Sequence, residues 1–322
     1  MIRLCLCFLQ GNAMNLLNDA RDERQLKALI GLSKDQFNKI LIRFADCYEE
    51  LKLQCYEDSQ QFDKRKPGAG AKGTLDTMDK KLFFILFYLK TYPTFDQLGY
   101  QFGLDRSNAN RQVHRLMPVL HRALEQLGVM PKRAFEEVED FNQVFDDIEK
   151  IIIDATERPH ARPVDKKAQK DQYSGKSKQH AVKNTVIADT YKKILFLGYT
   201  ACGSTHDYTL FKKEFPSDVD WFKRLSVLVD LGYLGIRNDY QIAELGIPHK
   251  KPRKSKSNPS PRLTEEQKEE NKALSKVRVI VEHAIGGMKV FGILRIKFRN
   301  RITNFVDDVA IVAAGLWNMK LC

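Results

Sequence analysis

The hydrophobic pattern of this chain changes its period close to residue 150. Before this point apolar residues recur every three or four positions, as in Leu26, Leu29 and Ile30, which is the spacing of amphipathic helices. After it, β-branched and aromatic runs such as IIID (151–154) and KKILFLGYTA (192–201) are separated by turn residues, which is typical of strands. The chain therefore divides into a helical first half and a second half that contains a sheet.

The second half alternates between the two patterns. Strands are expected at 151–154, 179–189, 192–201, 225–230 and 247–251. Helices are expected at 206–215, 264–291 and 307–321. Three successive strands, followed by strands that alternate with helices, indicate a mixed sheet flanked by helices. The expected fold class is α+β or α/β, with an all-helical N-terminal region before the sheet.

Composition shifts along the chain indicate five parts. Gly, Pro and Lys in KRKPGAGAKGT mark a basic connector, and acidic residues bridge into the second half. The expected parts are an N-terminal helical region at 1–63, the connector at 64–75, a second helical domain at 76–135, an acidic linker at 136–149 and the sheet domain at 150–322.

The charge of the chain points to a polyanionic partner. There are 53 Lys and Arg residues against 41 Asp and Glu residues, a net charge of +12, which favours nucleic acid over an anionic membrane surface. Six scattered cysteines without a CxxC pair suit a reducing compartment, so we expect a cytoplasmic protein. The apolar opening at 1–13 is too short to span a bilayer and is interpreted as a tail or as residues that precede a start at Met14.

A helix-turn-helix pattern lies at 91–120. Thr94 can cap one helix, Gly103 stands where a tight turn needs positive φ, and Asp105 can cap the next helix. The second helix then presents side chains of the types that read base edges and phosphates in a major groove: Arg106, Ser107, Asn108, Asn110 and Arg111. The alternative interpretation is an ordinary helical hairpin with a solvated polar face.

Two aspartates end apolar runs in the second half. Asp154 closes KIIID and Asp230 closes SVLVD, where Gly232 follows as a turn residue. Carboxylates at the ends of buried strands are costly unless they are paired, hydrogen-bonded or bound to metal, and open α/β sheets place their chemistry at the carboxyl ends of strands. The alternative for each aspartate is a simple turn cap.

A third acid lies on an apolar helix in VRVIVEHAIGGMK (277–289). At about 100° per residue, Arg278, Glu282 and Lys289 fall within a narrow wedge at the border of the buried stripe. If Glu282 joins Asp154 and Asp230, three carboxylates form a hard-oxygen site suited to Mg²⁺, with Arg278 and Lys289 near phosphates. The alternative is an intrahelical ion pair.

These motifs together resemble the DDE transposases of bacterial insertion sequences, close to the PIF/Harbinger-like group. The first half resembles the helix-turn-helix module of that family. The resemblance in the second half is to an RNase H-like catalytic domain and rests on IIIDATERP (151–159), YSGKSKQHAVKN (173–184), GSTHDYTLFK (203–212), VLVDLGYLG (227–235) and VRVIVEHAIGGMKVFGILR (277–295).

The resemblance implies that Asp154, Asp230 and Glu282 are a catalytic, metal-binding triad that holds two Mg²⁺ ions, for which Mn²⁺ can substitute. It also implies double-stranded DNA as partner, both terminal inverted repeats and target, a homodimer or higher oligomer in the synaptic complex, and a nucleoid-associated location without a membrane. The family signature Tyr-x2-Arg-x3-Glu-x6-Lys matches at Arg278, Glu282 and Lys289, whereas its first position holds Ser275.

Further residues are secondary candidates. Lys176, Lys178 and His180 form a basic turn into a strand and are expected to contact DNA, as are the basic runs at 249–256 and 295–301. Glu157 is interpreted as a neighbour that orders the strand or contacts substrate. For His206 and Asp207 helix capping is preferred over a functional role.

The function expected from these features is a DNA transposase that binds transposon ends, hydrolyses a phosphodiester at each end and transfers the freed strand to a target. Two alternatives stay open: a catalytically silent, domesticated transposase that acts as a DNA-binding regulator, and a structure-specific or RNA–DNA hybrid nuclease on the same fold. No Walker-type loop is visible, so no nucleotide cofactor is expected.

Overall fold

The computed structural model describes residues 20–58, 73–254, 260–302 and 304–322. It divides into two compact units, Met1–Val129 with Phe291–Ile293 and Met130–Val290 with Leu294–Cys322. The expectations for the opening residues 1–13 and for most of the 64–75 connector lie outside the described residues. Within the described residues no helix is long and apolar enough to cross a membrane.

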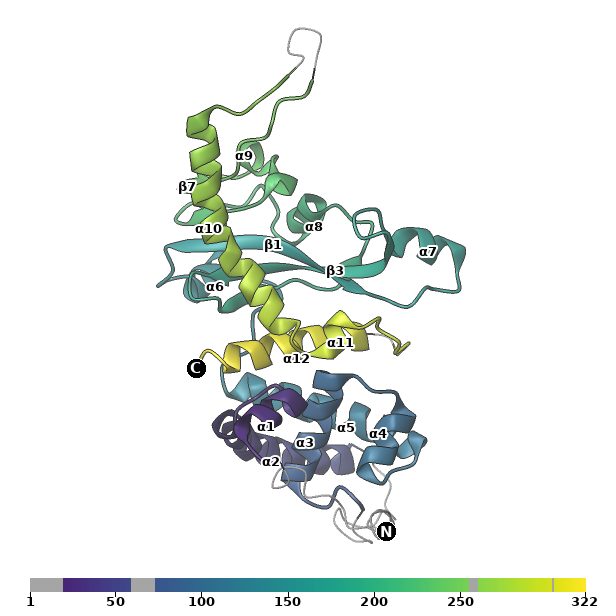
Figure 1. The fold of residues 1–322 in the computed structure, drawn as a ribbon. Helices are drawn as coiled ribbons and strands as arrows, with labels where there is room; N and C mark the ends of the chain where they lie inside the picture. The colour runs from purple at the N-terminus through teal and green to yellow at the C-terminus, as the bar shows by residue number, and fades with distance from the viewer. Residues whose placement is uncertain (1–19, 59–72, 255–259, 303) are drawn as a thin grey trace. The chain divides into compact units, whose positions relative to one another are not determined.

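The first unit is helical (Figure 1). Its helices are α1 (Glu23–Ile30), α2 (Lys34–Glu57), α3 (Met78–Thr91), α4 (Phe95–Phe102) and α5 (Arg106–Gln126). The expected capping box at Ser33 and Gln36 is confirmed, since each side chain accepts from the other's backbone N–H. Helix α3 is buried along nearly its whole length, from Lys81 to Leu89, so the other helices pack around it.

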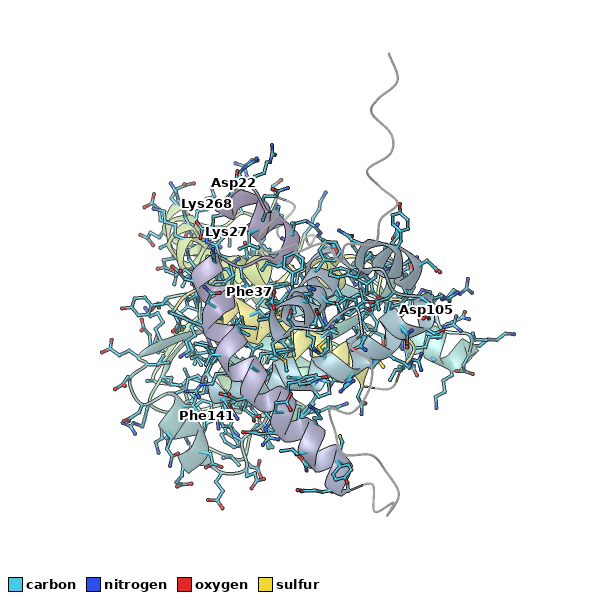
Figure 2. All side chains as sticks on the ribbon, turned by 90° about the horizontal axis from the view of Figure 1, so that it is seen from below. Asp22, Lys27, Phe37, Asp105, Phe141 and Lys268 are labelled. Carbon is cyan, nitrogen blue, oxygen red and sulfur yellow. The ribbon has the colours of Figure 1, made fainter. Side chains whose placement is uncertain are left out.

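The turn between α4 and α5 has the expected geometry. Thr94 caps α4 with a capping box, and Gly103 ends that helix at φ 65°, where an L side chain is strained. Asp105, labelled in Figure 2, accepts the Asn108 backbone N–H at 2.9 Å and so caps α5. Phe102 packs edge-on against Phe84 of α3, with 5.0 Å between ring centroids, which fixes α4 on the core.

The second unit is built on a seven-stranded mixed sheet with a main strand order of β2-β3-β1-β6-β7, with β4 and β5 paired to β3. Strand β1 is antiparallel to β3 over nine pairs and parallel to β6, as the expected mixed sheet requires. The strands are β1 (Lys150–Pro159), β2 (Tyr173–Ser174), β3 (Gln179–Asp189), β4 (Ile194–Leu197), β5 (Ala201–Cys202), β6 (Ser226–Leu228) and β7 (Glu244–Gly246).

Helices flank this sheet. They are α6 (Val138–Val144), α7 (Lys166–Gln172), α8 (Asp207–Glu214), the 3₁₀ turn η1 (Leu231–Tyr233), α9 (Ile236–Asp239), α10 (Glu265–Met288) and α12 (Phe305–Met319). The residues of the short helix α11 (Gly292–Arg295) are divided between the two units. Figure 1 shows α10 crossing β1 and β3. The arrangement of a mixed sheet with flanking helices is consistent with an RNase H-like fold, as expected from the resemblance.

The two faces of β1 contact different partners because successive side chains alternate. Ile151 and Ile153 belong to a core cluster with Phe141 of α6 and Phe211 of α8. Phe141, also labelled in Figure 2, thereby ties the acidic segment 136–149 to this core. On the other face Arg158 donates to the Val306 carbonyl at 2.7 Å, next to α12. Asp154 shares this second face.

The strand expected at 247–251 is wrong. The last strand is β7, which pairs with β6 through Leu245 and Gly246 and ends there. Pro248 has no N–H to donate to a ladder, so the chain leaves the sheet before the expected strand would begin. Ile247 is buried, which explains why the hydrophobic pattern favoured a strand.

Helix α10 packs closely on α12. Its start at Thr264 has the expected cap, in a capping box with Gln267. At its other end Gly287 lies against Trp317, so that a Cβ on Gly287 would be 2.2 Å from the indole ring. The two helices therefore approach at this point only because residue 287 has no side chain.

Candidate functional site

Asp154 and Asp230 lie at the same level of the sheet. The last parallel pair of β1 and β6 is Ile152 with Leu228, and each aspartate follows two residues later. Strand β1 continues beyond Asp154 to Pro159 in its pairing with β3, so Asp154 lies within a strand and not at its end as expected. It marks the place where the pairing with β6 stops.

The charges of the two aspartates interact. The pKa of Asp154 is raised to about 6, first by burial and also by repulsion from Asp230, even though the Ala155 N–H, Arg278 and Lys176 act to lower it. Asp154 Oδ1 accepts the Ala155 N–H at 2.7 Å, and Asp230 Oδ1 accepts the Gly232 N–H at 2.7 Å. The capping alternative therefore describes part of what Asp230 does.

Helix α10 brings basic groups to Asp154. Arg278 is half-buried and its charge acts on Asp154. Lys289, at the C-cap, donates from Nζ to the Glu157 carbonyl at 2.8 Å, and it also interacts with the charge of Asp154. Glu282 lies between Arg278 and Lys289 along the helix and is exposed.

The donor set suits a hard cation in part. Two carboxylates that repel each other at neighbouring strands are stabilised by a divalent ion such as Mg²⁺, which prefers oxygen ligands. Within the described residues, no group of three or more His, Cys, Asp or Glu side chains is arranged to hold a metal ion. The structure thus brings Asp154 and Asp230 together but does not assemble Glu282 with them.

Further along β1 from Asp154 lies a buried ionic network that was not predicted from the sequence. Lys183 of β3 is only 5% exposed, and its Nζ lies 2.8 Å from Asp207 Oδ1 and 3.5 Å from Glu157 Oε1. Glu157 also accepts the Ser174 hydroxyl at 2.9 Å. A lysine inside the apolar run of β3 was the available signal, because a buried lysine requires a partner.

This network revises the interpretation of Asp207. His206, not Asp207, caps α8 by accepting the Tyr208 N–H at 3.3 Å, as the preferred capping role for this pair predicts. Asp207 instead pairs with Lys183. Glu157 orders the strand as expected, through Lys183 and Ser174.

Tyr233 was also missed. It is fully buried, and its hydroxyl has no hydrogen-bond partner among the described residues. Burial raises its pKa well above the usual value, and the charges of Asp154, Asp207, Asp230 and Glu214 add to this effect. The Tyr233 hydroxyl therefore lies close enough to Asp154 and Asp230 for their negative charges to affect its pKa.

Five of the residues expected to contact DNA lie on α5. On α5, Arg106, Ser107 and Arg111 are exposed, whereas Asn108 and Asn110 are half-buried. Asn108 is partly committed within the helix, since its side chain donates to Asp105 and accepts from Arg111 at 2.5 Å.

The other expected DNA contacts lie in the second unit. Lys176 and Lys178 are exposed on the turn between β2 and β3, and His180 is half-buried on β3. The His180 ring contacts the Tyr173 ring at 5.8 Å between centroids. The charge of Lys176 acts on Asp154 and lowers its pKa.

Comparisons with known proteins agree with this architecture. Residues 153–318 match the model of the DDE superfamily endonuclease family, which is more than half of the chain. The chain belongs to the DDE superfamily endonucleases. Residues 74–126 match the helix-turn-helix of DDE superfamily endonucleases, the segment that contains α4 and α5.

A curated relative extends the likeness over nearly the full length. A probable transposase for insertion sequence element IS702 from Microchaete diplosiphon is 29% identical over 299 residues, which cover 92% of this chain and 95% of that protein. No solved structure matches the chain significantly. The resemblance to insertion-sequence transposases of the DDE superfamily is thereby confirmed.

Proposed function

We propose that this DDE superfamily endonuclease is a transposase that cleaves the ends of its own DNA element and joins them to target DNA. In this proposal α5 reads the terminal repeats in a major groove through Arg106, Ser107 and Arg111, with Asn108 and Asn110 beside them. Asp154, Asp230 and Glu282 hold the divalent ions. The protein would act at the nucleoid, as two or more copies, because both ends are processed.

One observation supports a catalytic site at the edge of the sheet that carries Asp154 and Asp230, which is called the catalytic edge below. The register of β1 and β6 sets Asp154 beside Asp230, and the charge of Asp230 raises the pKa of Asp154. A fold does not gain stability from two half-buried like charges at close range, so their proximity is better explained by a cation that both carboxylates bind. The family membership supports the same interpretation.

The acidic and basic residues of the site have separate roles in the proposed reaction. Bound Mg²⁺ would activate the attacking hydroxyl and neutralise charge on the leaving oxygen. Asp154 and Asp230 would hold the ions from the sheet, and Glu282 would supply the third carboxylate from α10 when DNA and metal are present. Arg278 and Lys289, on the same wedge of α10, are suited to the phosphates that flank the scissile bond.

The test uses the purified full-length protein, Mg²⁺ and a duplex that carries the ends of its own element. We expect end-specific nicking. Asp154→Asn and Glu282→Gln should each reduce nicking by at least about 1,000-fold, because metal ions contribute several kcal/mol to such transition states and ~1.4 kcal/mol is tenfold in rate. End binding, measured by gel shift, should stay intact in both variants.

The matched control is Glu269→Gln, which removes an exposed acid from the same helix and should leave nicking unchanged. End binding without cleavage by the unmodified protein would replace this proposal with the DNA-binding regulator. Cleavage that is independent of the terminal sequence would favour the structure-specific nuclease.

A further inference from the structure

The chain between β1 and β3 forms a basic segment at residues 160–178, which is called the basic arm. The proposed catalytic chemistry assigns no role to most of its lysines. The arm holds six Lys and Arg residues against two Asp residues, a net charge of +4. Its helix α7 (Lys166–Gln172) lies beyond the end of β3, at the edge of the second unit (Figure 1). A third of the net charge of the chain is thus concentrated in this short segment.

The lysines of the arm form one exposed surface. Lys166, Lys167 and Lys170 of α7 are exposed, as are Lys176 and Lys178 of the following turn. Among the described residues of this unit, the lysines that form ion pairs lie outside the arm, at Lys183, Lys212, Lys223 and Lys268.

The arrangement on α7 is unfavourable for the isolated helix. Lys166 and Lys170 stand at i and i+4, where like charges destabilise a helix. Of the two acids in the arm, Asp165 is committed to the N-cap, where it accepts the Ala168 N–H at 2.7 Å. A surface of this kind is stabilised when phosphates neutralise it.

The arm is fixed to the strand that carries Asp154. Ser174 donates to Glu157 of β1 at 2.9 Å, and the Ser177 N–H donates to Ser174 Oγ at 3.2 Å. The Ser204 N–H donates to the Asp171 carbonyl at 3.1 Å, and Glu157 is held in turn by buried Lys183. These contacts restrain the base of the arm relative to the catalytic edge.

The position of the arm relative to Asp154 follows from its contact with β1. Ser174 contacts Glu157, which is three residues beyond Asp154 on β1, so the turn after α7 that carries Lys176 lies near the catalytic edge. Helix α7, with seven residues, is about 10 Å long at ~1.5 Å per residue, which spans about three base-pair steps at ~3.4 Å each. DNA that reaches Asp154 past Lys176 would continue along this helix.

We propose that Lys166, Lys167 and Lys170 of α7, continued by Lys176 and Lys178, bind the phosphate backbone of the duplex next to the scissile phosphodiester. This inference rests on the proposed function for the meaning of the scissile bond. It adds α7 to the DNA-binding surface and assigns to the Ser174–Glu157–Lys183 contacts the role of holding that surface beside Asp154. The contacts are to phosphate and carry no base sequence information.

The test measures binding against salt for a triple variant, Lys166→Gln, Lys167→Gln and Lys170→Gln together. Loss of three phosphate contacts should reduce the slope of log K against log salt by about 2 to 3, at ~0.9 per phosphate, equally for element ends and for unrelated duplex. The matched control is Lys193→Gln, Lys213→Gln and Lys223→Gln, which removes the same charge from exposed lysines outside the arm. Its slope should change by less than about 0.5.

A crosslink locates the contact. A photoreactive residue placed at position 167 of the otherwise unmodified protein should crosslink to duplex within roughly six nucleotides of the scissile phosphate, given the length of α7. Equal slope changes in the two triple variants, or crosslinks only at distant sites, would overturn the inference. If the arm variant alone loses slope while the unmodified protein fails to cleave, the surface stands and the proposed function fails.

Discussion

Asp154 of β1 and Asp230 after β6 are brought together by parallel pairing that ends two residues before each of them. The repulsion between them is part of what raises the pKa of Asp154 to about 6. Such an arrangement costs stability in the free protein and is relieved by any group that neutralises the pair. It therefore connects metal binding to folding stability, which can be measured without DNA.

Divalent ions should stabilise the protein through this pair. At a concentration 100-fold above its Kd, Mg²⁺ or Mn²⁺ should add about 2.7 kcal/mol to the free energy of unfolding, which differential scanning fluorimetry detects as a higher Tm. Asp154→Asn and Asp230→Asn should each abolish most of this increase, whereas exposed Asp218→Asn should preserve it. An equal response in all four proteins, at matched ionic strength, would contradict a site at these aspartates.

Glu214 should make the second unit less stable as the pH rises from 4.5 to 7. Its carboxylate oxygens are buried without a hydrogen bond of good geometry, and burial raises the pKa of Glu214 from 4.5 to about 7, although nearby Thr185 and Arg133 lower it in part. Below pH 4.5 the group is protonated in both states and has no effect. As pH rises from 4.5 to 7 the unfolded state loses the proton first, so stability falls.

Glu214→Gln removes this dependence. At pH 8 the variant should be more stable than the unmodified protein by up to about 3 kcal/mol, at ~1.4 kcal/mol per pKa unit, and the difference should vanish near pH 4.5. Urea unfolding followed by tryptophan fluorescence measures both values, with exposed Asp218→Asn as the control. A difference that is constant across this pH range would exclude the carboxyl group as its cause.

Arg158 should be essential for the stability of the second unit. It is 2% exposed and donates to Asn184, Thr200 and the Val306 carbonyl. Arg158→Met should cost about 3–5 kcal/mol because several buried acceptors lose their donor together. Exposed Arg224→Met should change the free energy of unfolding by less than about 0.5 kcal/mol. Urea unfolding monitored by the fluorescence of Trp221 and Trp317 gives both values.

Gly103 should determine the stability of the turn between α4 and α5. At φ 65°, Gly103→Ala should destabilise the first unit by about 1 kcal/mol or more, whereas Gly103→Asn should cost less because asparagine tolerates this conformation. Thermal unfolding followed by far-UV circular dichroism compares the two variants. Equal stability of the alanine and glycine proteins would mean that the turn does not need the left-handed conformation.

The features that were predictable from sequence are local. Caps at Ser33, Thr94, Asp105 and Thr264 depend on residues within three positions of one another, and strand β3 has the expected limits because its apolar run is bounded by turn residues. The proximity of Asp154 and Asp230 could be anticipated because carboxyl ends of strands meet at one edge of a sheet.

The features that escaped prediction depend on long-range contacts. Lys183 meets Asp207 only because α8 packs over β3, and nothing near Lys183 in the sequence announces that partner. The extension of β1 past Asp154 depends on its antiparallel partner β3, since the polar residues of DATERP do not form a strand pattern by themselves. The position of Glu282 relative to the two aspartates depends on where α10 settles on the sheet.

The contact between Gly287 and Trp317 bears on that last point. Gly287 is five residues after Glu282 and on roughly the opposite side of the helix at ~100° per residue. Any larger residue there would push α10 away from α12 and rotate or shift its acidic and basic face with it. The direction in which Glu282 points is therefore set in part by a glycine on the other side of the same helix, where α10 packs against α12.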